Sequence, residues 1–166
     1  MMQKKGGLMI KVLFVCLGNI CRSPMAHFVF KDMVEKKGIS HLFEIESAGT
    51  EKFNSLCKAG IHYGTKEIFK RMNIPFEEHI SRHFTKEFYD EYDYILAMDD
   101  ENVKDILSII GGTDKQHKVK RLMDYTLSPA NVKDPWYTGN FDETYWDIYE
   151  GLNAFLSHLK LGEINE

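Results

Sequence analysis

The feature that most constrains the fold is a strand-like run, a tight loop and a helix-like run that follow one another without a gap. Strand-forming residues occupy positions 10–15, and apolar residues recur at helical spacing from position 25 to about Gly38. The loop between them reads Cys16-Leu17-Gly18-Asn19-Ile20-Cys21-Arg22-Ser23-Pro24. A loop between a strand end and a helix start directs several backbone N–H groups and the positive end of the helix dipole at one spot. The sequence therefore predicts an anion site with a cysteine inside it.

The residue types in this loop suit a nucleophile that attacks a bound anion. The loop amides and the Arg22 guanidinium favour the thiolate form of Cys16, which is the nucleophilic form. Gly18 allows backbone conformations closed to other residues, and Asn19 tolerates a left-handed one. Arg22 offers a planar fork for two oxygens, while Ser23 can cap the helix and donate a hydrogen bond to the thiolate. A buried cysteine at a strand end is more often inert, so the prediction depends on the whole combination.

Further patterns predict an α/β fold with a parallel sheet. Strands are expected at residues 43–48, 94–98 and 118–123, and helices at residues 65–73, 99–110 and 141–159. Alternation of strands and helices is typical of a layered fold with a parallel sheet. The 166 residues contain no internal repeat, low-complexity tract or linker. We therefore expect one domain over residues 9–166, preceded by a loose N-terminal extension at residues 1–8.

Composition and charge argue against several classes of protein. A net charge of −4 and the lack of a basic stripe with interleaved aromatics argue against nucleic acid as the main partner. No stretch approaches the roughly 20 apolar residues of a membrane span, and Lys11 interrupts the apolar run that would resemble a signal peptide. Three cysteines without a disulfide spacing indicate a reducing cytoplasm. The spacing of Cys16 and Cys21 does not suit zinc, so no metal site is expected there.

A second stretch, Asp134-Pro135-Trp136-Tyr137, could supply an acid and an aromatic pocket. Pro135 disfavours helix around the preceding residue, so we expect the Asp134 carboxyl to stand on a loop. Trp136 and Tyr137 could sandwich a phenyl ring. A positioned carboxylic acid that protonates a phenolate-like leaving group contributes about 10²–10⁴ in rate. Alone, Asp-Pro is a common turn signal, so this stretch gains weight only beside the cysteine loop.

Two other regions leave alternatives open. The polar connection at residues 49–64 is long enough to be functional. Its Phe53 could form a wall for a substrate ring or could tuck the connection onto the core. His79 and His83, taken on their own, are expected as surface or capping histidines, and the neighbouring Arg82 argues against a zinc pair there.

The segment from Val15 to Pro24 resembles the phosphate loop of the low-molecular-weight protein tyrosine phosphatases, and Asp134-Pro135 resembles the family's acid motif. The resemblance covers nearly the whole chain. It implies a three-layer α/β sandwich with a four-stranded parallel sheet in the order 2-1-3-4 and helices on both faces. It also implies hydrolysis of phosphotyrosine in proteins or peptides through a cysteinyl-phosphate, with inorganic phosphate as product and no cofactor.

The resemblance assigns roles residue by residue. Cys16 is the nucleophile, Arg22 holds the phosphoryl group, and Asp134 is first the general acid and then the general base. The residues implied to bind phosphate are Leu17, Gly18, Asn19, Ile20, Cys21, Arg22 and Ser23. Those implied to form the substrate pocket are Phe53, Trp136 and Tyr137.

The resemblance also implies supporting residues. Asn19 is held in a strained conformation by a network that includes Ser23, His79 and Asn102. Cys21 can form a reversible disulfide with Cys16, which protects the nucleophile from irreversible oxidation.

The chain departs from the family pattern in two places. His27 stands where the family usually has glutamate, which changes the electrostatics beside the loop. Residues 61–64 read Ile-His-Tyr-Gly where the family often has Asp-x-Arg, so a structural ion pair is expected to be missing. The run Leu56-Cys57-Lys58 suggests a reshaped substrate rim.

Three alternative functions stay open on the sequence. Protein-arginine phosphatases of the same fold typically carry threonine at the position of Ile20, and a branched aliphatic side chain leaves less room for a planar guanidinium. Arsenate reductases of this fold need two further cysteines, whereas only Cys57 lies outside the loop. A non-catalytic phosphate-binding module would need neither Asp134 nor the aromatic pair. These observations favour a phosphotyrosine phosphatase.

Overall fold

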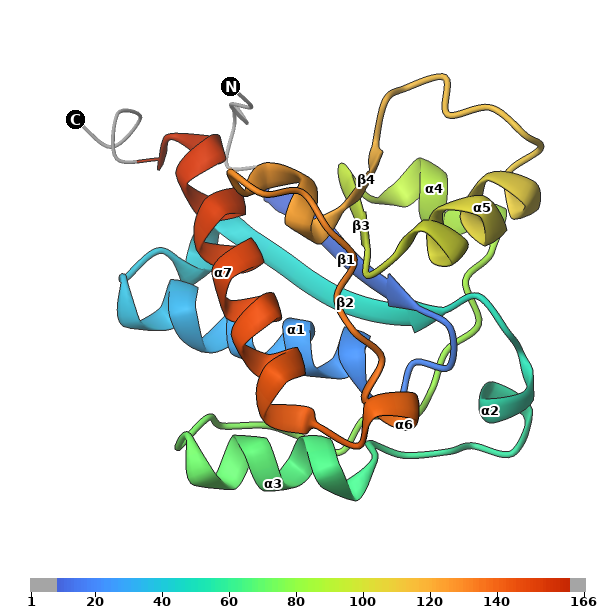
Figure 1. Cartoon of the computed structure of the whole chain (residues 1–166). Helices are drawn as coiled ribbons and strands as arrows, with labels where there is room; N and C mark the ends of the chain where they lie inside the picture. The colour runs from blue at the N-terminus through green and yellow to red at the C-terminus, as the bar shows by residue number, and fades with distance from the viewer. Residues whose placement is uncertain (1–8, 162–166) are drawn as a thin grey trace.

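The computed structural model describes residues 9–161 and has a parallel sheet at its centre (Figure 1). Strands β1 (Ile10–Cys16), β2 (Phe43–Gly49), β3 (Tyr94–Ala97) and β4 (Val119–Arg121) are arranged in the order β2-β1-β3-β4, with every neighbouring pair parallel. Strand β1 lies inside the sheet and is apolar on both faces, as a buried parallel strand must be. The predicted fold class and strand order are confirmed.

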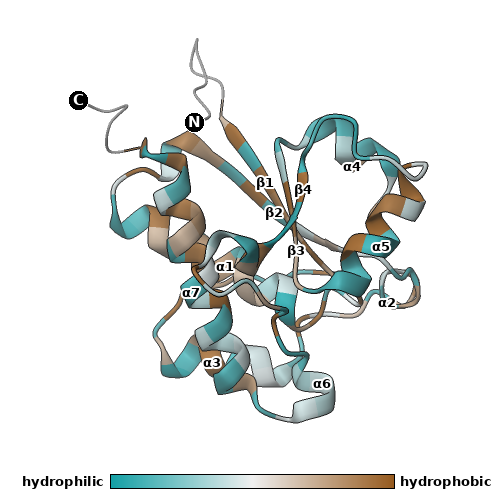
Figure 2. Cartoon of the chain, turned by 45° about the horizontal axis from the view of Figure 1, so that its top comes forward, coloured by the Kyte–Doolittle hydropathy of each residue, from teal (hydrophilic) through white to brown (hydrophobic). Residues whose placement is uncertain are grey.

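Helices cover both faces of the sheet, so the molecule has three layers (Figure 1). Val12 and Phe14 of β1 belong to the hydrophobic cluster formed with α1 (Arg22–Lys36), α3 (Tyr63–Arg71) and α7 (Phe141–Leu159). The alternate residues of β1 belong to a second cluster, formed with α4 (Lys86–Glu91) and α5 (Asp100–Ile109). Figure 2 shows hydrophobic and hydrophilic residues side by side along α5, as expected of a helix between core and solvent.

Several element boundaries differ from the sequence predictions. Helix α3 begins two residues early because the His62 side chain caps it by accepting a hydrogen bond from the Gly64 N–H. The predicted strand at 118–123 is shorter, since Leu122–Tyr125 forms a 3-10 helix. Helices α2 (Phe53–Leu56) and α4 were missed, because four and six residues carry too little periodicity to reveal a helix.

Asp134 lies outside the helices, as predicted, but the short helix that begins at the next residue was not predicted. Asp134 has an extended backbone, yet its side chain caps the short helix α6 (Pro135–Thr138) by accepting a hydrogen bond from the Trp136 N–H. Proline disfavours helix at the residue before it but suits the first helical position, where no N–H is needed. Asp134 is therefore held at a helix start, which restricts its carboxyl more than a loop would.

Among residues 9–161, no helix combines the length and the apolar character needed to cross a membrane. The predicted N-terminal extension at residues 1–8 lies outside the described residues. One further element, the 3-10 helix η1 (Ser40–Leu42), directly precedes β2.

Candidate active site

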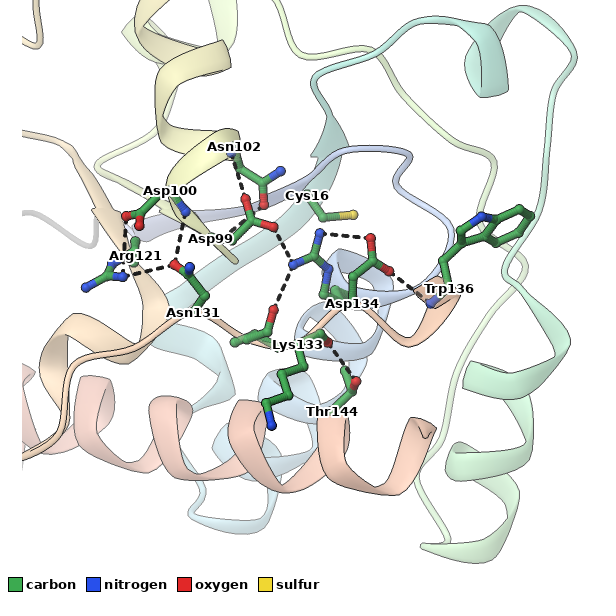
Figure 3. A network of polar contacts seen from close by, with 12 residues as sticks. Cys16, Asp99, Asp100, Asn102, Arg121, Asn131, Lys133, Asp134, Trp136 and Thr144 are labelled. Atoms are coloured by element: carbon green, nitrogen blue, oxygen red, sulfur yellow. Dashed lines mark hydrogen bonds and ion pairs between the residues drawn. The ribbon is translucent and has the colours of Figure 1, made fainter. Parts of the chain in front are cut away.

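The candidate site lies at the edge of the sheet where the parallel strands end. Cys16 is the last residue of β1, Asp99 follows β3, and the segment after β4 brings Asp134 to the same edge. Figure 3 shows the side chains of Asp99 and Asp134 approaching a common centre beside Cys16. Carboxyl ends of neighbouring parallel strands form such a site because the topology collects their loops at one edge.

The loop wraps around the sulfur of Cys16. Cys16 is 2% exposed, its Sγ accepts a hydrogen bond from the Asn19 N–H at 3.2 Å, and the Ser23 Oγ lies 3.1 Å away. The start of α1 lies directly behind the loop. Hydrogen bonds and a helix N-terminus both stabilise negative charge, so this environment suits a thiolate.

Asn19 adopts the left-handed conformation that the sequence allowed, with φ of 54°. Its Oδ1 accepts hydrogen bonds from the Arg82 N–H at 2.9 Å and from His79 Nε2 at 3.0 Å. Its Nδ2 donates to the Ser23 Oγ at 2.7 Å. A left-handed residue costs about 1–2 kcal/mol, and these three hydrogen bonds keep Asn19 in it. Two of the three predicted partners, Ser23 and His79, are thus in place.

Asn102, the third predicted partner, lies elsewhere. Its hydrogen bonds among the described residues run to Asp99: its N–H donates to Asp99 Oδ1 at 2.8 Å, and its Oδ1 accepts from the Asp99 N–H at 3.2 Å. The two residues form a capping box at the start of α5. Asn102 therefore contacts Asp99 rather than Asn19, and it acts on the loop only through the partner of Arg22.

Arg22 is 3% exposed and is held by three acceptors. Its Nη1 donates to Asp99 Oδ2 at 2.7 Å and to the Val132 carbonyl at 2.8 Å, and its Nη2 donates to Asp134 Oδ2 at 3.4 Å. Burial opposes the charged form, but the nearby Cys16 and Asp99 outweigh it and raise the pKa of Arg22. Asp99 is a site residue that sequence reasoning missed, because acidic residues in a first turn are explained by capping alone.

Behind the loop, two imidazoles are linked through Ser47. His27 Nδ1 lies 3.0 Å from the Ser47 Oγ, which lies 3.3 Å from His79 Nε2. Burial, reinforced by His79, lowers the pKa of His27 to about 3. Burial and the charge of Arg82 lower the pKa of His79 to about 4. Both rings are therefore neutral at pH 7, and His79 Nε2 carries the hydrogen that Asn19 accepts.

Cys21 is 6% exposed and is chemically unlike Cys16. Burial, with the negative charges of Cys16 and Asp134, raises the pKa of Cys21 to about 12. It is therefore a thiol at neutral pH, which makes it a poor nucleophile. Neither cysteine takes part in a disulfide, and neither does the exposed Cys57.

A cavity of about 370 Å³ opens onto the sulfur, and its walls come from segments far apart in the chain. Cys16, Leu17 and Ile20 of the loop line the cavity, and so does Asp134. The aromatic walls of the cavity are Phe53, Trp136 and Tyr137. All three aromatic side chains are exposed, so Phe53 stands at the rim rather than tucked onto the core. The cavity can take an aromatic ring with an anion at its base.

Two further residues bind the loop from outside, and neither could be identified from the sequence. The Ser81 Oγ donates to the Gly18 carbonyl at 2.9 Å, and Asn54 Nδ2 donates to the same carbonyl at 3.1 Å. Glu51 in turn accepts hydrogen bonds from the N–H groups of Phe53 and Asn54. These contacts attach the rim helix α2 directly to the loop.

Comparisons with known proteins agree with this geometry. The family model described as low molecular weight phosphotyrosine protein phosphatase matches residues 11–163. Low molecular weight protein-tyrosine-phosphatase YfkJ of Bacillus subtilis is 42% identical over 154 residues, which cover 92% of this chain and 97% of that protein. The crystal structure of YfkJ matches with a TM-score of 0.86 at 40% identity, over 95% of this chain and 98% of the other.

Two more solved structures are informative. SP-PTP, a low molecular weight protein tyrosine phosphatase from Streptococcus pyogenes, gives a TM-score of 0.78 at 37% identity, over 91% of this chain and 93% of the other. DARP, a drosophila arginine phosphatase, gives a TM-score of 0.82 at 27% identity, over 91% of this chain and 98% of the other. The similar structures thus include one named as a tyrosine phosphatase and one named as an arginine phosphatase.

Proposed function

The chain belongs to the low-molecular-weight phosphotyrosine protein phosphatase family, and on that premise we propose that it removes phosphate from phosphotyrosine in proteins or peptides through a cysteinyl-phosphate. One observation carries the proposal. Cys16, Arg22 and Asp134 line one cavity, and Arg22 Nη2 lies 3.4 Å from Asp134 Oδ2. A nucleophile, an anion-binding fork and a carboxyl group therefore surround one place where a phosphoryl group fits.

Binding of the phosphoryl group uses donors that the protein leaves available. A guanidinium has five N–H donors, and Arg22 gives three of them to Asp99, the Val132 carbonyl and Asp134. The Nε–H and the second Nη2–H have no acceptor within residues 9–161, and together they form a fork for two phosphate oxygens. Backbone N–H groups of the loop hold the remaining oxygen. Asp99 thus orients the guanidinium without occupying its phosphate-binding edge.

In the first step the Cys16 thiolate attacks phosphorus, so the S–P bond forms as the bond from phosphorus to the phenolic oxygen breaks. Asp134 gives its proton to that oxygen. This step requires the protonated form of Asp134. Charge that develops on the phosphate oxygens is stabilised by Arg22, the loop amides and the start of α1.

In the second step water attacks the cysteinyl-phosphate. Asp134, now a carboxylate, takes a proton from the water, the S–P bond breaks, and inorganic phosphate leaves while the thiolate is restored. Every charge in this cycle is met by a group of the chain, so the proposed mechanism requires no metal. We expect a chelator to leave the rate unchanged.

Substitution of Asp134 by asparagine should slow formation of the cysteinyl-phosphate by about 10²–10⁴-fold, because the amide cannot protonate the leaving oxygen. The loss should grow with the pKa of the leaving phenol, since good leaving groups depart without help. The measurement is kcat/KM for a series of aryl phosphates, because this ratio reports the steps up to formation of the cysteinyl-phosphate and not its hydrolysis. Asp142→Asn, which changes an exposed carboxyl paired with Arg71, is the control and should behave like the parent protein. Equal losses across the whole series would contradict an acid role.

Phosphotyrosine is favoured over phosphoarginine by the walls of the cavity. Ile20 and Leu17 line it with aliphatic groups, and the aromatic side chains at the rim suit a phenyl ring. A planar guanidinium carries N–H donors that need acceptors, and the aliphatic side chain of Ile20 offers none. These residues support a phosphotyrosine substrate even though a drosophila arginine phosphatase has a similar structure.

The experiment that tests this choice compares one peptide in two forms, phosphorylated on tyrosine or on arginine. The parent protein should have the higher kcat/KM for the phosphotyrosine form. Ile20→Thr should lower the ratio of the two kcat/KM values, because a hydroxyl at this position admits the guanidinium. A parent protein that prefers phosphoarginine would replace the proposal with its alternative.

We further propose a cytoplasmic enzyme whose partners are phosphoproteins rather than nucleic acids or membranes. Three free thiols suit a reducing compartment, and a net charge of −4 does not suit a polyanionic partner. Cys16 and Cys21 line the same cavity, which supports a reversible disulfide between them under oxidising conditions.

A further inference from the structure

A cluster of metal-ligating side chains lies behind the phosphate loop, apart from the residues that line the cavity. His27 comes from α1, Glu46 from β2, and His79 from the segment between α3 and α4. One potential ligand atom of each residue lies within 4.8 Å of one from each of the others. We propose that these three residues form a binding site for a divalent cation of the zinc class. The site is distinct from the catalytic centre, whose chemistry needs no metal.

The ligand set is the first argument. Two imidazoles with one carboxylate bind zinc and the late first-row divalent metals, with water completing the coordination. The two rings stand nearly perpendicular, at 84°, with centroids 5.4 Å apart. Ligand atoms around tetrahedral zinc lie about 3.3 Å apart for bonds of about 2.0–2.1 Å, so the present atoms must approach by up to about 1.5 Å. Glu46 can supply most of that movement because its side chain is half-exposed.

The hydrogen bonds of the two rings are the second argument. His27 is bonded through Nδ1 to Ser47, and His79 through Nε2 to Asn19 and Ser47. A metal would therefore be bound by the second nitrogen of each ring, Nε2 of His27 and Nδ1 of His79. Metal-bound histidines almost always donate their second N–H to an oxygen, and both oxygens are already in place.

Glu46 now forms an ion pair with Arg82, and breaking this ion pair costs little. Arg82 Nη1 lies 3.1 Å from Glu46 Oε1, and both side chains are about 40% exposed, at 42% and 37%. Exposed ion pairs of this kind contribute little to stability. Arg82 also stacks over the Phe88 ring, with 4.8 Å from its guanidinium carbon to the ring centroid, and it can keep that contact when Glu46 turns to a cation. The ion pair with Arg82 therefore does not prevent Glu46 from binding a cation.

His27 supplies the second imidazole of the cluster. A glutamate at position 27 would leave only one imidazole there. With His27 the cluster has two, and one of them, His79, holds Asn19 in its left-handed conformation. A cation bound here would lie one side chain away from the phosphate loop, so the loop is the part of the molecule that it would influence.

The test is a titration of the reduced full-length protein with Co²⁺, followed by visible absorption. One equivalent should bind through nitrogen and oxygen ligands, without the near-ultraviolet charge-transfer band that thiolate ligands produce. Variants His27→Gln and Glu46→Gln should each weaken binding by at least about tenfold, while His41→Gln, an exposed histidine outside the cluster, should bind like the parent protein. Circular dichroism melting of each variant in the absence of metal checks that it folds.

Three results would overturn the proposal: a thiolate band, which would place the metal on the cysteines; binding unchanged in both His27→Gln and Glu46→Gln; or no visible spectrum at millimolar Co²⁺. Glu46→Gln keeps the test decisive if His27→Gln fails to fold, because residue 46 is only half-buried. The titration contains no phosphorylated substrate, so its outcome is independent of the proposed phosphatase activity.

Discussion

The variant Cys16→Ser should fold normally and hydrolyse aryl phosphates on the order of 10⁴-fold or more slowly than the parent protein. Cysteine and serine differ by one atom, and the hydrogen bonds that reach the sulfur from Asn19 and Ser23 can also reach a hydroxyl oxygen. A hydroxyl stays protonated at neutral pH, however, even where amides and a guanidinium surround it. The variant should therefore retain the phosphate site and lose the nucleophile.

Steady-state hydrolysis of para-nitrophenyl phosphate measures the loss, and the rise in melting temperature on addition of inorganic phosphate measures the intact site. Cys57→Ser is the matched control because Cys57 is exposed and is absent from the walls of the cavity. It should keep full activity. Persistent turnover by Cys16→Ser, with Cys57→Ser unchanged, would mean that another group attacks phosphorus.

The loop could be predicted from sequence because its parts are adjacent in the chain. Cys16, Asn19 and Arg22 lie within one strand–loop–helix unit, where local backbone rules determine which groups face the anion. Asp134 was identified by its motif, but its distance of 3.4 Å from Arg22 depends on the strand order that brings the segment after β4 to the loop. Sequence patterns therefore identified both the nucleophile and the acid, but only the topology of the sheet shows that the two lie close together.

The errors at the site share one cause, which is that a residue with a sufficient local explanation hides its distant partner. Asp99 and Asn102 satisfy each other as a helix cap, so nothing nearby in sequence indicates that Asp99 also binds Arg22, 77 residues away in the chain. Asn102 was assigned to Asn19 by resemblance, whereas the capping box directs it to Asp99. His79 read as a surface histidine on residue type alone, because its partner Asn19 lies 60 positions away.

Substitution of Arg22 by lysine should lower kcat/KM for aryl phosphates by about 10³–10⁵-fold, comparable to the loss of a catalytic arginine in other phosphoryl transfer enzymes. Lysine carries one nitrogen at the end of a flexible stem, so it cannot bond Asp99 and the Val132 carbonyl while it presents a fork to phosphate. The loss should appear in both KM and kcat, because the fork holds the ground state and the transition state. Arg71→Lys, at an exposed pair with Asp142, is the control and should be silent.

Arg22 also has a structural role, and a second substitution separates the two. Arg22→Ala leaves the Asp99 carboxylate, whose side chain is 20% exposed, without its partner, and removal of one member of a buried ion pair costs about 3–5 kcal/mol. In the double variant Arg22→Ala/Asp99→Asn the unpaired charge is gone, so the melting temperature should recover much of its loss. Activity should not recover, because no fork remains to hold the phosphoryl oxygens. If activity returned together with stability, Arg22 would serve the fold alone, and the phosphate would have to be bound by the loop amides without it.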